Sequence, residues 1–540
     1  MTEAHSDRAL SWSLGLGALA LVYRAWLTRI YWGHEEEDWG NLQMIRGILD
    51  NPLGQVETEH MPLFTWFSAA VSALAGDPQL GGEILAVCCG AGVVAITTWI
   101  GFRWFSPIVG VLGGLLLCFQ PESALYSASP LRESLYTFLM MSGVLLVGGR
   151  RFPPGGAVLA LAFLARFNIA FSILPALTLW IIQIERTPEG SVRLAFRGGR
   201  RGLIALGLVA CTVGAWAIYY YLENETWNFW GGVVARNTGN AVTDLFVEER
   251  IRAVLGAVLG LLLVVLTSHA GWLVVPLAAL GVVRLSRAPR HNEDAARWLR
   301  LCGLGTVGLL VLTALLSTYD WRHNLYWKWL TPTVPYLCLF AVHGGRILVD
   351  GIVSHPLVRR GSFLETVPPR VVGILLALVA LGVTADGYRN ETHRQITVSN
   401  DMYGTQVRIA QWLEEEWEAE AGVLTWSASI PAAYLQRKPS EIRVRSWNDE
   451  SLPGDSPAEL GRWLTEERIG LVIWYAEEGT GAREAAGFLE SGQEQQLGPA
   501  LLKPLVLEDD YGTIAYIVEA EGIALPAEIP PPEFFAGAAP

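Results

Sequence analysis

The sequence predicts a polytopic membrane domain that is all-α, with about 11 and up to 13 spans, followed by a small extracytoplasmic α/β domain. Three observations support this fold class. Hydrophobic residues make up 51% of the 540 residues, and only 17% are charged, against about 25% in soluble proteins. Apolar runs of span length recur through residues 10–385. Acidic residues are concentrated after residue 400, where the sequence has 25 acidic and 9 basic residues.

Each span needs about 20 apolar residues, and some candidates are shorter or fused. The first candidate lacks a small-residue cleavage site, so we expect an anchor and not a cleaved signal. The apolar stretch Met61–Ala75 is too short for a span and is interpreted as a re-entrant or interfacial helix. The eleven candidates are Leu10–Ile30, Glu83–Phe105, Pro107–Phe119, Leu131–Gly148, Gly155–Leu164, Phe167–Ile184, Leu203–Leu222, Ile251–Val283, Trp298–Ser317, Leu325–Val342 and Val371–Ala385.

The basic residues predict the orientation, because short cytoplasmic loops are rich in Lys and Arg. Basic stretches at 150–151, 186–201, 284–300 and 346–370 are assigned to the cytoplasmic side. The loops 31–82, 120–130, 223–250 and 318–324, and the tail after residue 386, then lie outside. We therefore expect residues 1–390 to form the membrane domain of a bacterial-type inner or plasma membrane protein.

The tail alternates helix and strand patterns, which predicts an α/β domain over residues 395–525. Ser456-Pro457 is a typical N-cap and first-turn pair, and the continuous apolar run Ile469–Tyr475 is typical of a buried strand. Residues 526–540 are rich in Pro and Ala and are expected to be disordered. The expected elements are helices over Gln406–Glu418 and Ser456–Glu467, and strands over Gly422–Trp426, Ile469–Tyr475, Leu505–Leu507 and Thr513–Val518, the last two joined by a hairpin turn.

The first external loop carries four consecutive carboxylates, Glu35–Asp38, directly after a predicted span and between aromatic residues. A solvated acidic loop is the simplest interpretation. An amphipathic stretch follows, however, and would lay the loop along the bilayer surface. Carboxylates at that depth can act as a general base. His60, near the end of the same loop, is a candidate ligand or phosphate contact.

Further charged residues lie at the outer ends of other predicted spans, where charge is costly and usually functional. Arg132 and Glu133 begin one span, and Arg166 lies in an external turn. Arg322, His323 and Lys328 form a third group that suits a phosphate or pyrophosphate headgroup. Interfacial anchoring is the alternative for the first and third groups, and a simple turn residue is the alternative for Arg166.

Several chemistries have no motif in this sequence. The six cysteines show no metal-ligand spacing, and a P-loop, a zinc-protease motif and a nucleophile elbow are absent. ATP-driven transport is therefore not expected, and neither is a nucleotide cofactor. A basic nucleic-acid footprint is absent as well.

The ordered set of motifs resembles the GT-C membrane glycosyltransferases of the protein O-mannosyltransferase and lipid A aminoarabinose transferase type. His60-Met61-Pro62-Leu63 is similar to the family's His-Pro-Pro-Leu, and Pro121 with Arg132-Glu133 stands where the family has a second acidic residue. Arg322 with Pro332 and Pro335 resembles the family's Arg-x-Leu-x-Pro-x-x-Pro. The first loop departs from the family pattern, because it reads Glu-Glu-Glu-Asp where the family usually has Asp-Glu. The Trp-Trp-Asp motif of oligosaccharyltransferases is absent, which disfavours that branch.

The resemblance implies a polyprenyl-phosphate sugar donor and an inverting transfer to an acceptor hydroxyl on a protein, lipid or glycan. Glu36, Glu37 or Asp38 would be the base, with Glu133 and His60 supporting the acceptor or a metal. The donor phosphate would meet Arg132, Arg166 and the 322–328 cations, or a divalent cation as candidate cofactor. A transporter or flippase for a lipid-linked glycan is the alternative, although it should place ionisable residues near the midplane.

Overall fold

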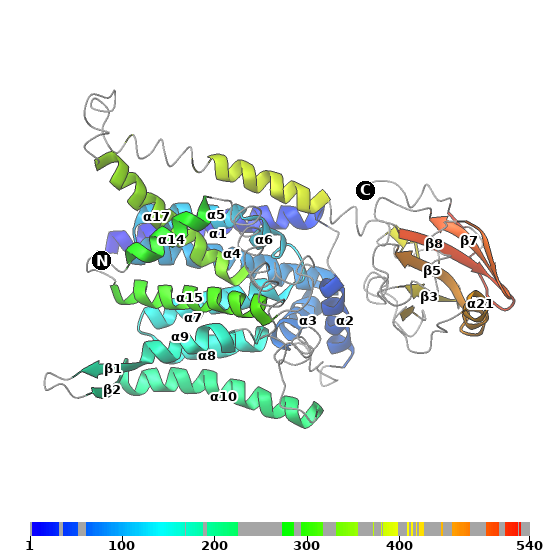
Figure 1. Cartoon of the computed structure of the whole chain (residues 1–540), viewed down its shortest axis with the longest axis horizontal. Coiled ribbons are helices and arrows are strands. Elements are labelled where there is room, and N and C mark those ends of the chain that lie inside the picture. Colours follow the sequence, from blue (N-terminus) through cyan, green and yellow to red (C-terminus); the bar gives the residue numbers. More distant parts are fainter. Residues whose placement is uncertain are drawn as a thin grey trace, which may run out of the picture. The chain divides into compact units, whose positions relative to one another are not determined.

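The structure is a computed structural model of the whole chain (Figure 1). It describes residues 3–31, 36–51, 61–167, 169–186, 192–224, 273–285, 293–316, 331–354, 371, 380, 382–397, 408–409, 412–413, 417, 421–425, 444–446, 456–475, 493–506, 513–526 and 529–530. The chain divides into two compact units, which are described separately. The membrane unit comprises Met1–Arg29 and Ile48–His393, and the tail unit comprises Ile30–Gly47 and Arg394–Pro540.

The membrane unit is a bundle of apolar helices around one hydrophobic core (Figure 1). Within it, α4 packs against α3, α5 and α7, and the pair α7–α8 continues the bundle to α10. A second group joins α9 to α15 and α14 to α17. The helices are α1 (Glu3–Ile30), α3 (Leu63–Ala75), α4 (Pro78–Trp104), α5 (Pro107–Phe119), α6 (Pro121–Leu125), α7 (Arg132–Gly148), α8 (Phe152–Ala165), α9 (Ile169–Ile181), α10 (Gly199–Asn224), α14 (Val274–Leu285), α15 (Glu293–Leu316) and α17 (Val334–Ser354).

Among the described residues, four helical segments are long and apolar enough to cross a membrane: Ser6–Ile30, Pro78–Trp104, Gly199–Leu222 and Thr331–Ile352. Five shorter apolar helices accompany them, including Leu63–Ala75, the segment interpreted from the sequence as re-entrant or interfacial. The polytopic helical character is thus confirmed, and the number of spans stays a prediction. The predicted span Val371–Ala385 lies largely outside the described residues.

Local sequence explains where these helices begin. Asp77 caps α4, accepting a hydrogen bond from the Leu80 N–H at 2.6 Å, and Ser106 caps α5 in the same way. Proline follows each cap, where its missing N–H costs nothing. The two helices then approach closely, because a Cβ on Gly101 would lie 2.6 Å from the Gly110 Cα. Small residues allow apolar helices to pack this tightly in a membrane.

Three segments differ from the sequence prediction. Residues 120–130, predicted as an external loop, form α6 and a turn that are buried throughout. The basic stretch after α9 contains an antiparallel hairpin of β1 (Ile182–Arg186) and β2 (Val192–Phe196), so the predicted span to Ile184 ends at Ile181. The span predicted at Leu325–Val342 is described as a 3₁₀ turn, η2 (Thr331–Thr333), and α17, which runs on to Ser354. Its polar end is supported by the Arg346–Asp350 pair at 3.8 Å.

The tail unit contains a six-stranded mixed sheet with strand order β4-β3-β5-β8-β7-β6. Strand β3 is parallel to β4 and β5, and the remaining pairs are antiparallel. Two hydrophobic clusters contain alternating strand residues, as expected for a sheet buried on both faces. The elements are α2 (Glu36–Asp50), β3 (Gly422–Thr425), β4 (Val444–Ser446), α21 (Pro457–Glu466), β5 (Ile469–Tyr475), β6 (Gln495–Leu497), β7 (Ala500–Val506) and β8 (Thr513–Glu519).

The local predictions for the tail are confirmed where the structure describes it. The run Ile469–Tyr475 is β5, and Ser456 caps α21 by accepting from the Glu459 N–H. Of the two predicted hairpin strands, the first falls at the end of β7, and the second, Thr513–Val518, is nearly all of β8; β7 and β8 pair antiparallel. In the predicted helix Gln406–Glu418 only residues 408, 409, 412, 413 and 417 are described, and the first four are helical.

Candidate functional site

A buried ion pair joins the start of α7 to the end of α8. Glu133 lies in the first turn of α7, and Arg166 is the C-cap residue of α8. Because α7 and α8 are consecutive packed helices joined by a short turn, the start of one lies beside the end of the other. The Arg166 Nη1 and the Glu133 Oε1 form a salt bridge, with side-chain exposures of 8% and 0%. Two residues that the sequence singled out separately are therefore partners.

Arg132 adds a second cation to this end of the bundle. It precedes Glu133 in α7, is partly buried, and lies near enough to Arg166 to repel its charge. The Tyr126 ring also neighbours Arg166. The group Arg132, Glu133 and Arg166 thus combines one carboxylate with two guanidinium groups. Its excess positive charge suits an anionic ligand such as a phosphate.

The buried segment before α7 supplies a further acidic residue. Glu122 is only 2% exposed and accepts a hydrogen bond from the Gln120 Nε2. Gln120 in turn accepts from the Ser123 N–H at 2.6 Å, which fixes the first turn of α6. The Ser134 hydroxyl donates to the Tyr126 carbonyl at 3.2 Å and so ties the segment to α7. A buried carboxylate here was not predicted from the sequence, although its position between apolar runs was a signal.

The other predicted site residues are not placed by the structure. Glu36, Glu37 and Asp38 begin α2, whose backbone is helical there, but their side chains lie outside the described part of the chain. His60, Arg322, His323 and Lys328 also lie outside the described residues. Among the residues that are described, no group of three or more His, Cys, Asp or Glu side chains could hold a metal ion. The roles of the seven residues named in this paragraph, and the use of a divalent metal ion, stay predictions.

A second ion-pair group lies at the opposite end of α7 and α8. Asp294, at the start of α15, pairs with Arg150 at 3.2 Å and with Arg197 at 3.0 Å. Arg197 also stacks over the Trp180 ring at 3.9 Å. The Asp294 side chain is 45% exposed, and the hydrogen bond from Arg197 holds the pKa of its carboxyl below the usual range, with the charges of Arg197 and Arg150 adding to the effect.

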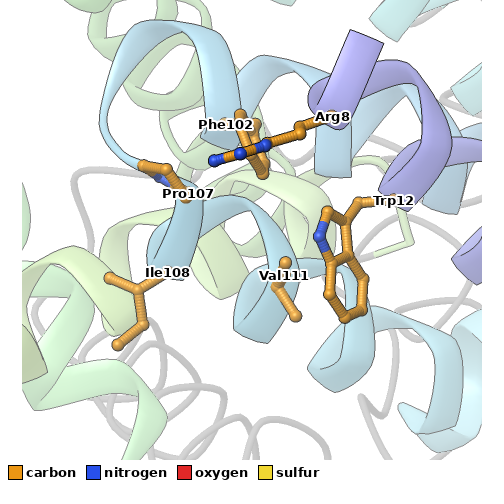
Figure 2. A pocket seen from close by; sticks show the side chains of 6 residues that line it. All are labelled: Arg8, Trp12, Phe102, Pro107, Ile108 and Val111. Carbon is orange, nitrogen blue, oxygen red and sulfur yellow. The ribbon is translucent and has the colours of Figure 1, made fainter. Parts of the chain in front are cut away.

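A groove of about 310 Å³ opens on the surface between α1, α4 and α5 (Figure 2). Trp12, Phe102, Ile108 and Val111 give it apolar walls, and the Arg8 side chain reaches over it from α1. Arg132, Glu133 and Arg166 are not among the lining residues. The groove therefore has the character of a lipid-facing surface, and the buried ion pair is the better candidate site.

Solved structures show which fold this arrangement belongs to. ArnT from Cupriavidus metallidurans bound to undecaprenyl phosphate is similar with a TM-score of 0.55 at 12% identity, over 96% of this chain and 99% of that one. The oligosaccharyltransferase AglB from Archaeoglobus fulgidus, in complex with an inhibitory peptide and a dolichol-phosphate, gives 0.51 at 10% identity, over 96% and 75%. The apo oligosaccharyltransferase from the same organism gives 0.52 at 11%, with the same coverage.

Sequence comparison adds no closer relative, because no family model matches this chain and no curated protein does. At these identities the likeness is a likeness of fold. It extends along nearly the whole of this chain and nearly the whole of ArnT. The resemblance drawn from the motifs is confirmed at that level: the chain has the GT-C fold of membrane-embedded glycosyltransferases.

Proposed function

We propose that this chain is an integral membrane glycosyltransferase. It moves a sugar from a polyprenyl-phosphate donor to an extracytoplasmic acceptor hydroxyl on a protein, lipid or glycan, with inversion. The observation that supports this most is the buried pair Glu133–Arg166, with Arg132 beside it, at one end of a GT-C bundle. Burying ionised groups costs several kcal/mol each, and ionisable groups retained inside a membrane domain are usually functional.

The reaction needs a base for the acceptor and cations for the leaving phosphate. The acceptor oxygen attacks the anomeric carbon as the bond from that carbon to the phosphate oxygen breaks. The acceptor proton passes to a carboxylate of the first loop, Glu36, Glu37 or Asp38, and the polyprenyl phosphate leaves with its electron pair. Arg132 and Arg166 stabilise the phosphate as it leaves, since preorganised cations in a dry site act strongly on developing charge.

The loop residues complete the proposed assignment. Arg322, His323 and Lys328 would bind the donor phosphate together with the two arginines, and His60 would support the acceptor. Glu133 orients Arg166 through their ion pair. A divalent cation stays a candidate cofactor: Glu133 and His60 would support it, and it would stabilise the negative charge of the leaving phosphate.

Reconstituted transfer tests this proposal. The purified chain in proteoliposomes is given a panel of polyprenyl-phosphate sugars, and release of polyprenyl phosphate is measured with and without candidate acceptors. We expect at least one donor to be consumed by wild type and not by Asp38→Asn or Glu37→Gln. Movement of intact lipid-linked glycan between leaflets, with no phosphate released, would support the transporter alternative. If each loop carboxylate can be neutralised singly while the transfer rate stays at the wild-type value, none of them is the base.

We expect residues 31–60 and 395–520 to lie on the same, extracytoplasmic side, because Lys and Arg are concentrated in the loops assigned to the other side. Two cysteine variants, Gln55→Cys and Ser399→Cys, are made with Cys88 and Cys211 replaced by Ser. Each variant is labelled in intact cells with a membrane-impermeant maleimide. We expect both positions to react. Labelling of only one would contradict the orientation.

A further inference from the structure

Among the described residues of the membrane unit, one buried arginine, Arg24, has no role in the proposed mechanism. Arg24 lies in α1, six residues before the helix ends at Ile30, and its exposed fraction is 0%. Six helical residues span about 9 Å, which is within reach of the interface for a side chain as long as arginine. Arg24 instead points into the bundle. An arginine that turns away from water needs a compensating reason.

The contacts of Arg24 are polar but uncharged. Its Nε donates to the Ser127 hydroxyl at 2.9 Å, and its Nη2 donates to the Ser123 hydroxyl at 3.2 Å. Cys118 is the third polar neighbour. Within the described part of the chain, the buried Nη1 has no hydrogen-bond partner and no carboxylate pairs with the guanidinium. Two serine hydroxyls are therefore its main polar compensation.

A glycine on α4 provides the space that the contact between Arg24 and Ser127 needs. A Cβ added to Gly90 of α4 would lie 2.4 Å from the Ser127 Cβ and 2.9 Å from the Arg24 Nε. Real Cβ atoms do not approach other atoms so closely, so glycine at this position leaves room for the contact. The guanidinium thus joins three segments that are distant in sequence: α1, α4 and the buried turn after α6.

The two serines lead directly to the candidate site. Ser123 and Ser127 lie on either side of Tyr126, and the Ser127 hydroxyl donates to the Ser123 carbonyl, which closes the turn. The Tyr126 carbonyl accepts from Ser134 in the first turn of α7, and its ring neighbours Arg166. The turn held by Arg24 is therefore hydrogen-bonded to the first turn of α7, and its Tyr126 lies within electrostatic range of Arg166.

We propose that Arg24 is a positioning residue for this site. It acts through Ser123 and Ser127 to fix the turn around Tyr126, and the turn fixes the start of α7 and the Arg166 side chain. The inference rests on the proposed function. A merely structural arginine would give another result: Arg24→Met would then change the unfolding temperature and leave kcat/KM at the wild-type value.

The test compares Arg24→Met with Arg29→Met, an exposed arginine on the same helix. Thermal unfolding in detergent and the kcat and KM for the best donor of the panel are measured for both. We expect Arg24→Met to unfold within about 2 °C of wild type but to lose at least about tenfold in kcat/KM, mainly in kcat. Arg24→Lys should recover part of this loss, and Arg29→Met should match wild type. Wild-type kcat/KM in Arg24→Met would overturn the inference.

Two further measurements cover the other outcomes. If Arg24→Met does not fold, Ser127→Ala removes the same contact with a smaller change and should show the same kcat effect. If wild type consumes no donor, the proposed function fails, and a readout without turnover tests Arg24. Ser129, 0% exposed beside this turn, is replaced by Cys with Cys88 and Cys211 changed to Ser. Thiol labelling should be at least about tenfold faster when Arg24→Met is added; equal rates would overturn the positioning role.

Discussion

The two ends of the α7–α8 pair use the same kinds of side chain in opposite ways. At the start of α7, Glu133 and Arg166 are paired and almost completely buried, with exposures of 0% and 8%. At the other end, Asp294 pairs with Arg150 and Arg197, and the three side chains are 45%, 78% and 25% exposed. The first arrangement has a high desolvation cost and the second a low one. A buried ion pair is weak evidence for stability, so the cost of the first arrangement needs another explanation.

The comparison shows which group is expected to carry chemistry. Exposed ion pairs contribute about 0–1 kcal/mol and are screened by salt, which fits an anchor at the predicted cytoplasmic surface. A buried pair acts in a medium of low dielectric constant, where its field on a bound phosphate is strong. If this interpretation is correct, equivalent substitutions at the two ends must have unequal effects.

The largest expected difference is in sugar transfer. Glu133→Gln and Arg166→Met each remove one partner of the buried pair, and we expect transfer to fall by about 100-fold or more. Asp294→Asn and Arg150→Gln serve as matched controls at the exposed end and should stay within about twofold of wild type. Initial rates in proteoliposomes decide this. Equal losses at both ends would break the comparison.

A smaller difference is expected in stability. Glu133→Leu leaves Arg166 buried without its partner, which should lower the free energy of unfolding by about 3–5 kcal/mol. Adding Arg166→Met should restore most of that stability and none of the activity. Asp294→Ala should cost about 1 kcal/mol or less. Denaturant unfolding in detergent measures each value. A double variant that stays as unstable as Glu133→Leu would show that the pair serves structure.

The smallest effect concerns pH at the exposed end. Because the pKa of Asp294 is held below its ordinary value in the folded chain, its carboxylate stabilises the fold above the ordinary pKa, about 4. That contribution is lost as pH falls through the lowered folded value. Wild type should therefore unfold at a slightly higher temperature than Asp294→Asn near pH 7, and the two should converge in acid. A constant difference at all pH values, or none near pH 7, would contradict the assigned cause.

Local patterns predicted much of the fold. The continuous apolar run Ile469–Tyr475 forms β5 because a strand buried on both faces needs no polar residue, and Ser456 caps α21 through contacts three residues away. The charges Glu133 and Arg166 were predicted as site residues because the first stands at the outer end of a predicted span and the second lies between two apolar runs. These signals are contained in a few neighbouring residues. They do not depend on how the helices pack.

The remaining features depend on long-range packing. The pairing of Glu133 with Arg166 joins residues 33 positions apart, and the contact of Arg24 with Ser127 joins residues 103 positions apart. Residues 120–130 were predicted as an external loop because they separate two predicted spans, yet tertiary contacts bury them. Arg24 was missed, although a cation six residues inside the end of a predicted span was a signal.

Release of polyprenyl phosphate in a single turnover tests the central claim most directly. A radiolabelled polyprenyl-phosphate sugar found active in the panel is mixed with excess reconstituted wild type, Asp294→Asn or Glu133→Gln, in the presence of acceptor. The account predicts that wild type and Asp294→Asn release the lipid phosphate at the same rate and that Glu133→Gln releases it at least about 100-fold more slowly. Release by Glu133→Gln at the wild-type rate would contradict the claim that the buried pair marks the site of glycosyl transfer.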